Sequence, residues 1–380
     1  MPTEPPSPPI TTQAWTYTAL STSPRSALSL SSSHPVVFPP PSSSEETVLI
    51  SVSYAALNPA DIVNLTCIPY FFHSTLSAVP ALDFTGVVLQ SHTPAPSPSP
   101  VQQRFSPGDK VICFPPLYHM LKTGIGGLQR TVPIPAKYCV KLPEGKKLIE
   151  GAGLMLTGCT ALLQVRQAGI KKGDRVLVVG ASGGVGSAAV QLVRDTVGKN
   201  GHIVAVCSGR NIELVKSLGA DEVVDYTQHK NLPGYLTDKF GGDNNKFDHI
   251  IDGFGNQELY KACAGFLKEE GVYDAASIHY DTYRYWDLFK SVVKIGLNIV
   301  WPRSRWLGGT GRRFKICSLD DPGLDMMDYL AGMLGEGRLK VAVDSVWGFG
   351  EVDKGFDVLM GGHAAGKVVV KVGEGEEEEE

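Results

Sequence analysis

Residues 176–186, VLVVGASGGVG, form an apolar segment that breaks into glycines and then continues as SAAVQLVRDTVG, which has a helical pattern. Small residues stand at the first, third and sixth positions of the turn, which are Ala181, Gly183 and Gly186. This spacing suits a dinucleotide-binding turn, because the turn is tight and its backbone N–H groups approach a pyrophosphate at the helix N-terminus. The residues predicted to bind a dinucleotide are Ala181, Ser182, Gly183, Gly184 and Val185.

Strand-like and helix-like segments alternate around this turn. Strands alternating with helices at such spacing build right-handed βαβ units and a parallel sheet. We therefore predict an α/β fold with a Rossmann doubly wound parallel sheet, and Asn256 is a plausible helix N-cap. The predicted strands are 176–180, 202–207, 222–226, 247–252 and 271–276, and the predicted helices are 185–197, 211–219, 232–240 and 256–269.

The residues after the second of these strands select between NADH and NADPH. An NAD site usually has Asp or Glu about 20 residues past the last glycine, where it bonds the ribose 2′-OH. This chain has Ser208 and Arg210 instead. A hydroxyl and a guanidinium bind a 2′-phosphate by charge-assisted hydrogen bonds, worth about 1.5–3 kcal/mol each. We therefore predict NADPH as the cofactor, with these two residues at its 2′-phosphate.

The N-terminal third has a different rhythm, with short strands bounded by Gly or Pro and no long helix. This pattern predicts a barrel-like β domain, with a proline-rich exposed loop at 93–100. A helix at 325–340 and a strand at 366–372 follow the α/β region, and we expect this C-terminal piece to return to the first domain and complete it. The predicted N-terminal strands are 46–57, 84–92, 109–114 and 138–143.

Composition excludes several classes of function. The chain has 380 residues, 43% of them apolar, and a formal net charge of -4, so it lacks the basic excess that nucleic-acid binding requires. Its seven cysteines form no CxxC pair, which fits a reduced intracellular protein. The sequence shows neither a secretory signal nor an uninterrupted apolar span of membrane length, and we expect a cytoplasmic location.

The order of several motifs points to one family. The chain resembles the medium-chain dehydrogenase/reductase superfamily over nearly its whole length, and most closely its zinc-independent quinone oxidoreductases and enoyl reductases, including fungal trans-acting ones. No single motif is specific to a substrate. The ordered motifs are ALNPADIVNL (56–65), PALDFTGVV (80–88), GDKVICF (108–114), LTGCTAL (156–162), GASGGVG (180–186), LGADEVVDY (218–226), FDHIIDGFG (247–255) and GKVVVKV (366–372).

The resemblance implies a two-domain organisation. A β-rich, GroES-like catalytic domain would occupy residues 1–152, and an NADPH-binding Rossmann domain would occupy residues 153–317. Residues 318–372 would then return to the catalytic domain. The acidic tail 373–380, GEGEEEEE, is predicted to be disordered because its charges repel one another.

Zinc is not expected in this chain. Zinc-dependent members of the superfamily carry Gly-His-Glu where this sequence reads Leu82, Asp83 and Phe84, and no His-Glu dipeptide occurs anywhere in it. A catalytic zinc needs about three Cys, His or carboxylate ligands, and a structural zinc needs four. The hydride must therefore go to a carbon that is electrophilic without a metal, such as the β-carbon of an enone, an enoyl thioester or a quinone.

The resemblance also implies site residues in the cleft between the domains. Asn58 would orient the nicotinamide carboxamide or bond the substrate carbonyl oxygen, where negative charge develops. Its alternative role is that of a turn asparagine before proline. Several relatives have a tyrosine as proton donor where this chain has Val63, so a dedicated protein acid is in doubt, and Tyr70 and His73 are better explained as pocket lining. The implied cofactor contacts are Thr160, Tyr226, Phe254 and Lys367.

Residues 286–315 form a long segment that is rich in apolar and basic residues, and three interpretations stay open for it. The segment could form a lid or wall of a substrate pocket, a dimer contact, or a helix at a membrane surface. Arg303 and Arg305 follow its apolar part. Bulky apolar residues near the cleft would suit a greasy, polyketide-like or lipid-like substrate.

These observations together predict an NADPH-dependent, zinc-independent oxidoreductase that transfers a hydride to an activated C=C bond. The substrate would be a small apolar α,β-unsaturated carbonyl or quinone, or an acyl chain tethered to a polyketide synthase. The alternatives are a quinone reductase and a non-catalytic, membrane-associated module that binds NADPH. We expect a monomer or homodimer, with neither nucleic acid nor a membrane surface as the partner.

Overall fold

The computed structural model describes residues 10–18, 21, 23–38, 45–68, 77–93, 103–277, 279, 282–300, 309–317, 319 and 321–373. Four residues and two segments named above lie outside this part of the chain. They are Tyr70, His73, Arg303, Arg305, the proline-rich loop from residue 94 onward and the acidic tail from residue 374 onward.

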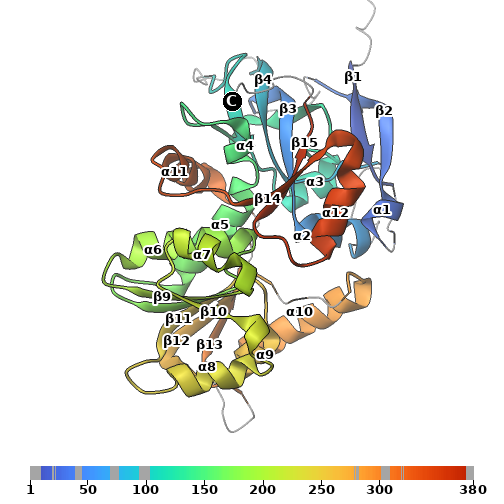
Figure 1. Ribbon diagram of the computed structural model, residues 1–380. Coiled ribbons are helices and arrows are strands. Elements are labelled where there is room, and N and C mark those ends of the chain that lie inside the picture. Colours follow the sequence, from blue (N-terminus) through green and yellow to red (C-terminus); the bar gives the residue numbers. More distant parts are fainter. Residues whose placement is uncertain are drawn as a thin grey trace, which may run out of the picture.

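A six-stranded parallel sheet forms the lower part of the molecule in Figure 1. Its strand order is β10-β9-β8-β11-β12-β13, so the first strand of the unit lies in the middle and the chain winds outward on both sides. This is the Rossmann order, which confirms the predicted fold class. The strands are β8 (Arg175–Val179), β9 (His202–Cys207), β10 (Glu222–Asp225), β11 (Phe247–Asp252), β12 (Leu267–Ala275) and β13 (Arg313–Ile316).

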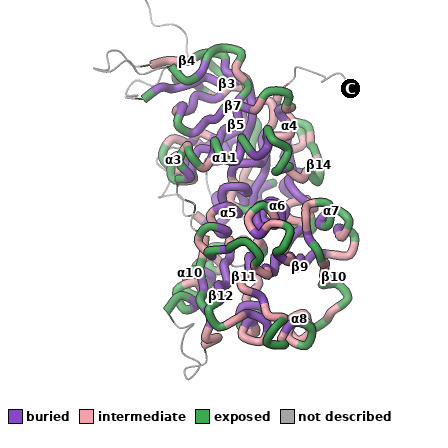
Figure 2. Tube along the Cα trace, turned by 90° about the vertical axis from the view of Figure 1, so that its left-hand side faces the viewer, coloured by how far each residue is buried: buried purple, intermediate pink, exposed green. Residues whose placement is uncertain are grey.

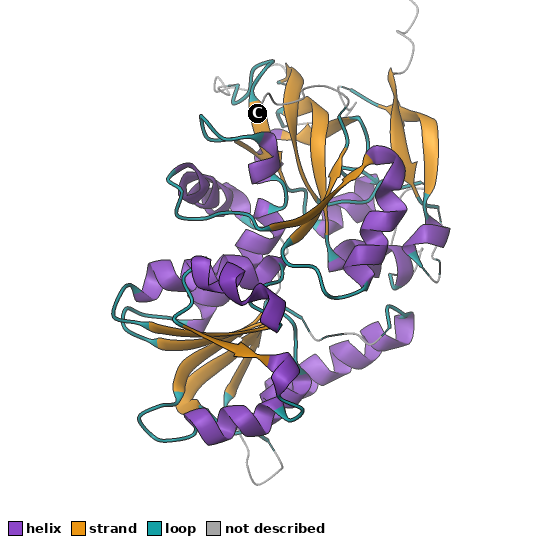
Figure 3. Cartoon of the chain, viewed as in Figure 1, coloured by secondary structure: helices purple, strands orange, loops and turns teal. Residues whose placement is uncertain are grey.

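Alternate side chains of β8 enter two different cores, which explains why the whole strand is apolar. Val176 and Val178 pack with residues of α5, α6 and α7, whereas Leu177 and Val179 pack with residues of α8 and α9. Helices therefore cover both faces of the sheet, as Figure 3 shows. These helices are α5 (Leu154–Ala168), α6 (Gly184–Val197), α7 (Ile212–Ser217), α8 (Leu232–Phe240) and α9 (Gln257–Ala262).

The helix predicted at 256–269 and the strand predicted at 271–276 both had wrong bounds, since β12 begins at Leu267. The helix expected at 256–269 ends at Ala262, and after one 3-10 turn the chain enters β12 at Leu267. Phe266 and Leu267 are fully buried, so packing in the sheet prevails over the local helical pattern. Asn256 does cap α9, because its side chain accepts the N–H groups of Glu258 and Leu259, each at 3.1 Å.

A second, seven-stranded sheet forms the upper part of the molecule. Its order is β14-β15-β3-β4-β5-β7, and β6 pairs with β3. Strand β15, near the C-terminus, pairs antiparallel with β3, so the C-terminal segment does complete the first sheet, as expected. The strands are β3 (Thr47–Leu57), β4 (Asp83–His92), β5 (Lys110–Cys113), β6 (Thr131–Pro135), β7 (Cys139–Lys141), β14 (Val343–Gly348) and β15 (Lys367–Lys371).

A hairpin precedes this sheet in a region that the sequence did not identify as structured. Strands β1 (Ile10–Thr16) and β2 (Ser29–Val36) pair antiparallel, with the short helix α1 (Pro24–Ala27) between them. The indole N–H of Trp15 donates to the carbonyl of Phe349 at 2.7 Å, which ties the hairpin to the C-terminal segment.

The remaining helices surround the seven-stranded sheet or extend from the Rossmann sheet. The boundaries predicted for the two domains remain a prediction, because α5 contacts both sheets. These helices are α2 (Pro59–Thr66), α3 (Leu117–Thr123), α4 (Leu148–Gly151), α10 (Tyr285–Val300), α11 (Gly323–Gly335) and α12 (Val352–Met360).

Helix α5 lies between the two sheets, and Figure 2 shows it within the buried part of the trace. Within the described residues, the segment Leu148–Ala168 is the one helical stretch long and apolar enough to cross a membrane by length and composition. Its most apolar window is 78% buried inside the protein, as expected of a core helix.

Candidate active site

The glycine turn joins β8 to α6 with very little space between helix and strand. A Cβ atom placed on Gly186 would lie 2.0 Å from the carbonyl oxygen of Gly180 and 2.8 Å from Cα of Ala181. Gly180 has a φ of +68°, which side chains disfavour. The N–H of Ala181 donates to the carbonyl of Val206 at 3.0 Å, which fixes the turn against β9. The turn therefore has the tight geometry of a dinucleotide-binding loop.

The N-terminus of α6 is open to an anion. Its N-cap is Gly183, which has no side chain to bond the first-turn N–H groups, and these groups have no partner within a helix. Gly184 and Val185 begin the helix, and the hydroxyl of Ser182 accepts a hydrogen bond from the Asn211 amide at 2.9 Å. Unpaired N–H groups and the positive helix end fit a pyrophosphate. The residues of this turn therefore fit a dinucleotide.

The loop after β11 lies beside the glycine turn. Strands β8 and β11 are neighbours at the point where the strand order reverses, which is where open α/β sheets bind ligands. A Cβ atom on Gly180 would lie 3.1 Å from Cβ of Phe254, so this predicted cofactor residue does lie at the turn. The Phe254 ring is half-exposed and stacks on His279 with a centroid separation of 4.2 Å.

Asp252 holds this loop, and sequence reasoning missed it. Its carboxylate accepts N–H groups from Phe254, Gly255 and Asn256 at 2.7–2.9 Å and the Tyr273 hydroxyl at 2.6 Å. Burial raises the pKa of Asp252, and these four donors oppose that rise. The loop that carries Phe254 is therefore rigidly fixed to the end of β11.

The predicted 2′-phosphate residues lie at the end of β9. Ser208 precedes a 3-10 turn, and Arg210 within that turn is exposed. One guanidinium nitrogen of Arg210 donates to the carbonyl of His363, a residue of the C-terminal segment. Because guanidinium has five N–H donors, this bond leaves Arg210 able to bind an anion.

A carboxylate that the sequence reasoning did not consider lies beside this turn. Asp225, at the end of β10, accepts the N–H of Thr227 at 3.0 Å and its hydroxyl at 2.7 Å. A Cβ atom on Gly209 would lie 2.4 Å from an Asp225 oxygen. Hydrogen bonds from Thr227, both to Oδ1, lower the pKa of Asp225, so the group is ionised. Tyr226 follows it and is exposed.

Two predicted residues from opposite ends of the chain meet in a buried contact. The Lys367 ammonium donates to the side-chain oxygen of Asn58 and, at 3.2 Å, to the carbonyl of Leu57. The Asn58 amide nitrogen donates to the carbonyl of Ala56 at 3.1 Å. The Asn58 carboxamide is therefore engaged at both its oxygen and its nitrogen, and its catalytic role stays a prediction.

The Lys367 side chain runs between the two domains. Cβ atoms placed on Gly153 and Gly184 would lie 2.5 Å and 3.2 Å from its methylene carbons, so both glycines leave room for it. This places Lys367 next to the N-terminus of α6, where a cofactor pyrophosphate would bind. Burial lowers the pKa of Lys367, and the negative charges of Asp83 and Asp61 oppose that effect.

Asp61 and Asp83 complete this buried cluster, and sequence reasoning gave neither a functional role. Asp61 accepts the N–H of Asn58 at 2.9 Å and that of Ala81 at 3.1 Å, and Asp83 accepts the N–H of Leu156 at 3.1 Å, in the first turn of α5. Burial raises the pKa of each carboxyl to about 6. The cluster therefore connects α2, α5 and β15, and the charge of Lys367 affects the pKa of both carboxyl groups.

This cluster pairs its two carboxylates with a buried ammonium. Asp83, at the position where zinc-dependent relatives have a ligand motif, is bonded to backbone N–H groups and faces the Lys367 ammonium. Its neighbour Phe84 is a fully buried core residue. Among the residues that the structure describes, no group of three or more His, Cys, Asp or Glu side chains could hold a metal ion.

Two further positions from the sequence analysis, Thr160 and Val63, lie in helices α5 and α2. Thr160 is buried in α5, and its hydroxyl donates to the carbonyl of Leu156 at 2.7 Å within the same helix. Thr157, one turn earlier, is the threonine that lies against the glycine turn, because its methyl group would be 3.0 Å from a Cβ on Gly184. Val63 is partly buried on α2, and it offers no proton.

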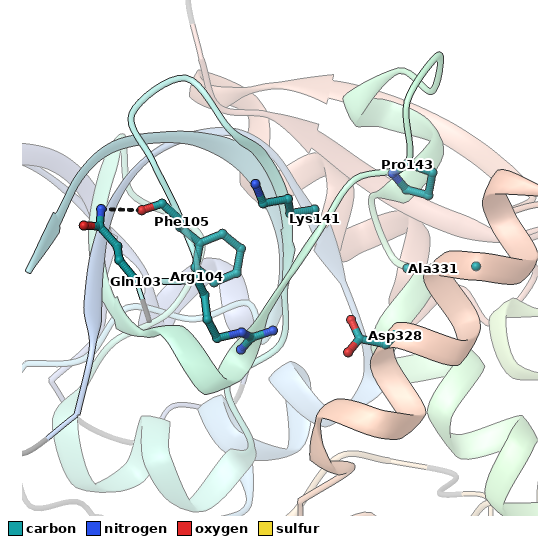
Figure 4. Close-up of a pocket in the computed structure, with 8 residues that line it drawn as sticks. Gln103, Arg104, Phe105, Lys141, Pro143, Asp328 and Ala331 are labelled. Carbon is teal, nitrogen blue, oxygen red and sulfur yellow. Dashed lines mark hydrogen bonds between the residues drawn. The ribbon is translucent and has the colours of Figure 1, made fainter. Parts of the chain in front are cut away.

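A pocket of about 490 Å³ opens elsewhere, between α11 and the loops of the seven-stranded sheet (Figure 4). Asp328 lies on its α11 side, and Arg104 and Lys141 lie on the opposite side. None of the predicted site residues lines it, so we do not assign it to the reaction.

The fold and the site together define a two-domain oxidoreductase that binds a nicotinamide dinucleotide. Residues 44–144 match the family described as alcohol dehydrogenase GroES-like domain, and residues 218–370 match the family described as zinc-binding dehydrogenase. A medium chain reductase (pydE) from Acremonium sp is 30% identical over 366 residues, which cover 91% of this chain and 95% of that protein. The chain belongs to the medium-chain dehydrogenase/reductase superfamily, in its branch of enoyl and quinone reductases.

Further relatives agree with this placement. The trans-enoyl reductase poxH of Penicillium oxalicum is 27% identical, covering 88% of this chain and 92% of its own length. A chloroplast envelope quinone oxidoreductase homolog of Arabidopsis thaliana is 29% identical, covering 88% and 93% respectively. The solved quinone oxidoreductase from Coxiella burnetii superposes with a TM-score of 0.69 over 96% of this chain and 100% of its own, at 22% identity, which shows the shared fold.

Proposed function

We propose that this protein is an NADPH-dependent, zinc-independent reductase that transfers a hydride to the β-carbon of an apolar α,β-unsaturated carbonyl compound. The observation that carries the proposal is the pairing of a pyrophosphate-shaped glycine turn with Ser208 and Arg210 at the end of β9. Relatives named trans-enoyl reductase support the choice of a C=C bond as the acceptor.

The preference for NADPH rests on charge. The end of β9 carries no acidic side chain in the position that bonds a ribose 2′-OH, and Arg210 supplies a cation there. Asp225 ends the neighbouring strand β10, and its Oδ1 accepts two hydrogen bonds from Thr227. A 2′-phosphate would therefore meet a guanidinium that is able to bond it.

Replacing Arg210 with Asp tests this preference directly. The ratio of the NADH to the NADPH dissociation constant should fall roughly 10- to 100-fold, because a charge-assisted bond is lost and a repulsion is gained. Lys172→Asp is the matched control, since Lys172 is also exposed but precedes β8 at the other end of the sheet. An unchanged ratio in Arg210→Asp would refute the assignment of the 2′-phosphate site.

When bound, the nicotinamide cofactor supplies the hydride, and the chain supplies position and charge. The α6 N-terminus would hold the pyrophosphate, Phe254 would lie beside the glycine turn, and Lys367 would add a positive charge near the pyrophosphate. Lys367 also fixes the Asn58 carboxamide in one orientation through a direct hydrogen bond. With Val63 at the position of the relatives' proposed acid, water would protonate the enolate.

Quinone reduction is the second candidate, favoured by relatives named quinone oxidoreductase. Product analysis separates the two functions, because alkene reduction gives a saturated ketone and quinone reduction gives a hydroquinone. NADPH consumption should be measured with a panel of enones, enoyl thioesters and quinones. Tight NADPH binding without turnover on any acceptor would contradict both functions and favour a non-catalytic module.

A further inference from the structure

Helix α10 exposes a broad apolar side, while its two fully buried residues are polar, which is unusual for a surface helix. Ser291 and Asn298 are the buried residues of the helix. The apolar residues recur at helical spacing along the opposite side, where they form one continuous stripe. The exposed fractions in this stripe are Tyr285 47%, Trp286 65%, Phe289 52%, Val292 58%, Val293 44%, Leu297 55%, Ile299 51% and Val300 80%.

Specific contacts hold α10 in this orientation. Near its C-terminal end, Asn298 exchanges two side-chain hydrogen bonds with Gln257 of α9, at 3.0 and 3.1 Å. Before its N-terminus, the partly buried Tyr283 packs against the core of the seven-stranded sheet. Turning the apolar stripe inward would break both hydrogen bonds of the Asn298–Gln257 pair, of which Asn298 is buried. The outward stripe is therefore a fixed feature of the fold.

The exposed charges beside the stripe are basic. Lys290 and Lys294 are exposed one helical turn apart, and Arg284 is exposed just before the helix. Asp287 is the one acidic residue of α10; its carboxylate is 21% exposed, accepts the Thr282 hydroxyl and lies 3.9 Å from the Lys290 ammonium, which is 67% exposed. The helix thus presents a positive edge on a protein whose net charge is -4.

This arrangement discriminates among the three interpretations that the sequence left open for residues 286–315. A pocket wall requires side chains that the protein covers from more than one side, whereas the stripe is 44–80% exposed along its whole length. In a symmetric dimer the same surface meets itself, so Lys290 and Lys294 of both copies would crowd into one interface. An anionic lipid surface accepts both features, because acyl chains cover the apolar stripe and headgroups pair with the lysines.

We propose that α10 binds the surface of an anionic lipid bilayer, with the stripe from Tyr285 to Val300 in the interface and Lys290 and Lys294 at the headgroups. Trp286 and Tyr285 suit this position, since their rings have an apolar body and a polar atom. The expectation from sequence alone, that a membrane surface is not a partner, is replaced by this proposal. The proposal does not depend on the reductase function.

Co-sedimentation with lipid vesicles tests it. The full-length protein should bind vesicles of equimolar phosphatidylcholine and phosphatidylserine, bind phosphatidylcholine vesicles more weakly, and dissociate as salt is raised. Lys290→Gln with Lys294→Gln should weaken binding to the anionic vesicles about 25-fold, roughly fivefold per charge. Trp286→Ser with Phe289→Ser should weaken binding to both kinds of vesicle by about tenfold per residue.

Matched variants elsewhere serve as controls. Leu89→Ser removes a comparably exposed apolar side chain, and Lys110→Gln with Lys172→Gln removes two exposed charges outside α10; both should bind like the unmodified protein. Retained NADPH affinity and melting temperature would show that the α10 variants are folded. The proposal is overturned by absence of vesicle binding, by equal binding of the α10 variants, or by a dimer that only the α10 variants lose in sedimentation.

Discussion

Replacing Gly186 with alanine should separate helix α6 from the strand that precedes it. The new Cβ would lie 2.0, 2.7 and 2.8 Å from backbone atoms of Gly180 and Ala181, and no side-chain rotation relieves a clash with backbone. We expect a loss of about 3 kcal/mol of stability, the upper part of the range for overpacked cores. The NADPH dissociation constant should also rise about tenfold, because displaced N–H groups lose hydrogen bonds of about 1 kcal/mol each.

Gly183→Ala provides the matched comparison within the same turn. Its Cβ would lie 3.4 Å from the Gly180 oxygen, an ordinary contact, and the backbone φ of -77° suits alanine. Its melting temperature should match that of the unmodified protein, while its NADPH affinity falls because the methyl group occupies the space that a phosphate approaches. Calorimetry and fluorescence titration measure both quantities. A Gly186→Ala variant that melts and binds NADPH normally would refute the close packing.

Three further predictions concern buried polar groups. The pKa of Asp83 is raised to about 6, so the folded state binds more protons than the unfolded state between about pH 4 and 6. Stability should therefore fall as pH rises through that window. Asp83→Asn should make the fall in melting temperature over this pH range smaller. Lys367→Met should destabilise the protein by about 3–5 kcal/mol at pH 8, and by less at pH 5, because it leaves buried carboxylates without their cation. Asn298→Ala should cost about 0.5–1.5 kcal/mol in thermal unfolding by removing its hydrogen bonds with Gln257, and an unchanged melting temperature would contradict the fixed orientation of α10.

Local pattern was sufficient for the centre of the Rossmann sheet. Strands β9 and β11 and helix α8 have the predicted boundaries, because each is a short apolar or amphipathic segment bounded by turn residues. Helix α5 was not predicted, although it is long. It lies between two sheets and is buried on most sides, so it lacks the one-sided stripe that marks a surface helix.

Other elements depend on contacts between distant parts of the chain. The β1–β2 hairpin has a Ser-rich second strand, and it is fixed by pairing across Ala14 and Gln129 and by the Trp15 bond to Phe349. Strand β13 (Arg313–Ile316) was not predicted. Its residues lie at the end of segment 286–315 and at Ile316, where the sequence analysis assigned no strand. Such elements are selected by tertiary packing, which local propensity does not record.

The glycine turn could be identified from sequence because its function requires a fixed spacing. The buried cluster beside it could not, since Asn58 and Lys367 are 309 positions apart and their contact exists only after both sheets have formed. The motif PALDFTGVV includes Asp83, but from sequence we discussed this residue only because it stands where zinc-dependent relatives have a ligand motif. Its burial against α5 and beside Lys367 is visible only in three dimensions.

The position of β15 has a consequence for the order in which the protein is made. This strand lies between β14 and β3, yet it comes from residues 367–371, near the end of the chain. All strands of the Rossmann sheet are synthesised before it, so that sheet can fold while the ribosome is still translating the message. The seven-stranded sheet keeps an unpaired edge on β3 until residues 367–371 have been synthesised, so the domain whose strands begin first is completed after the Rossmann sheet.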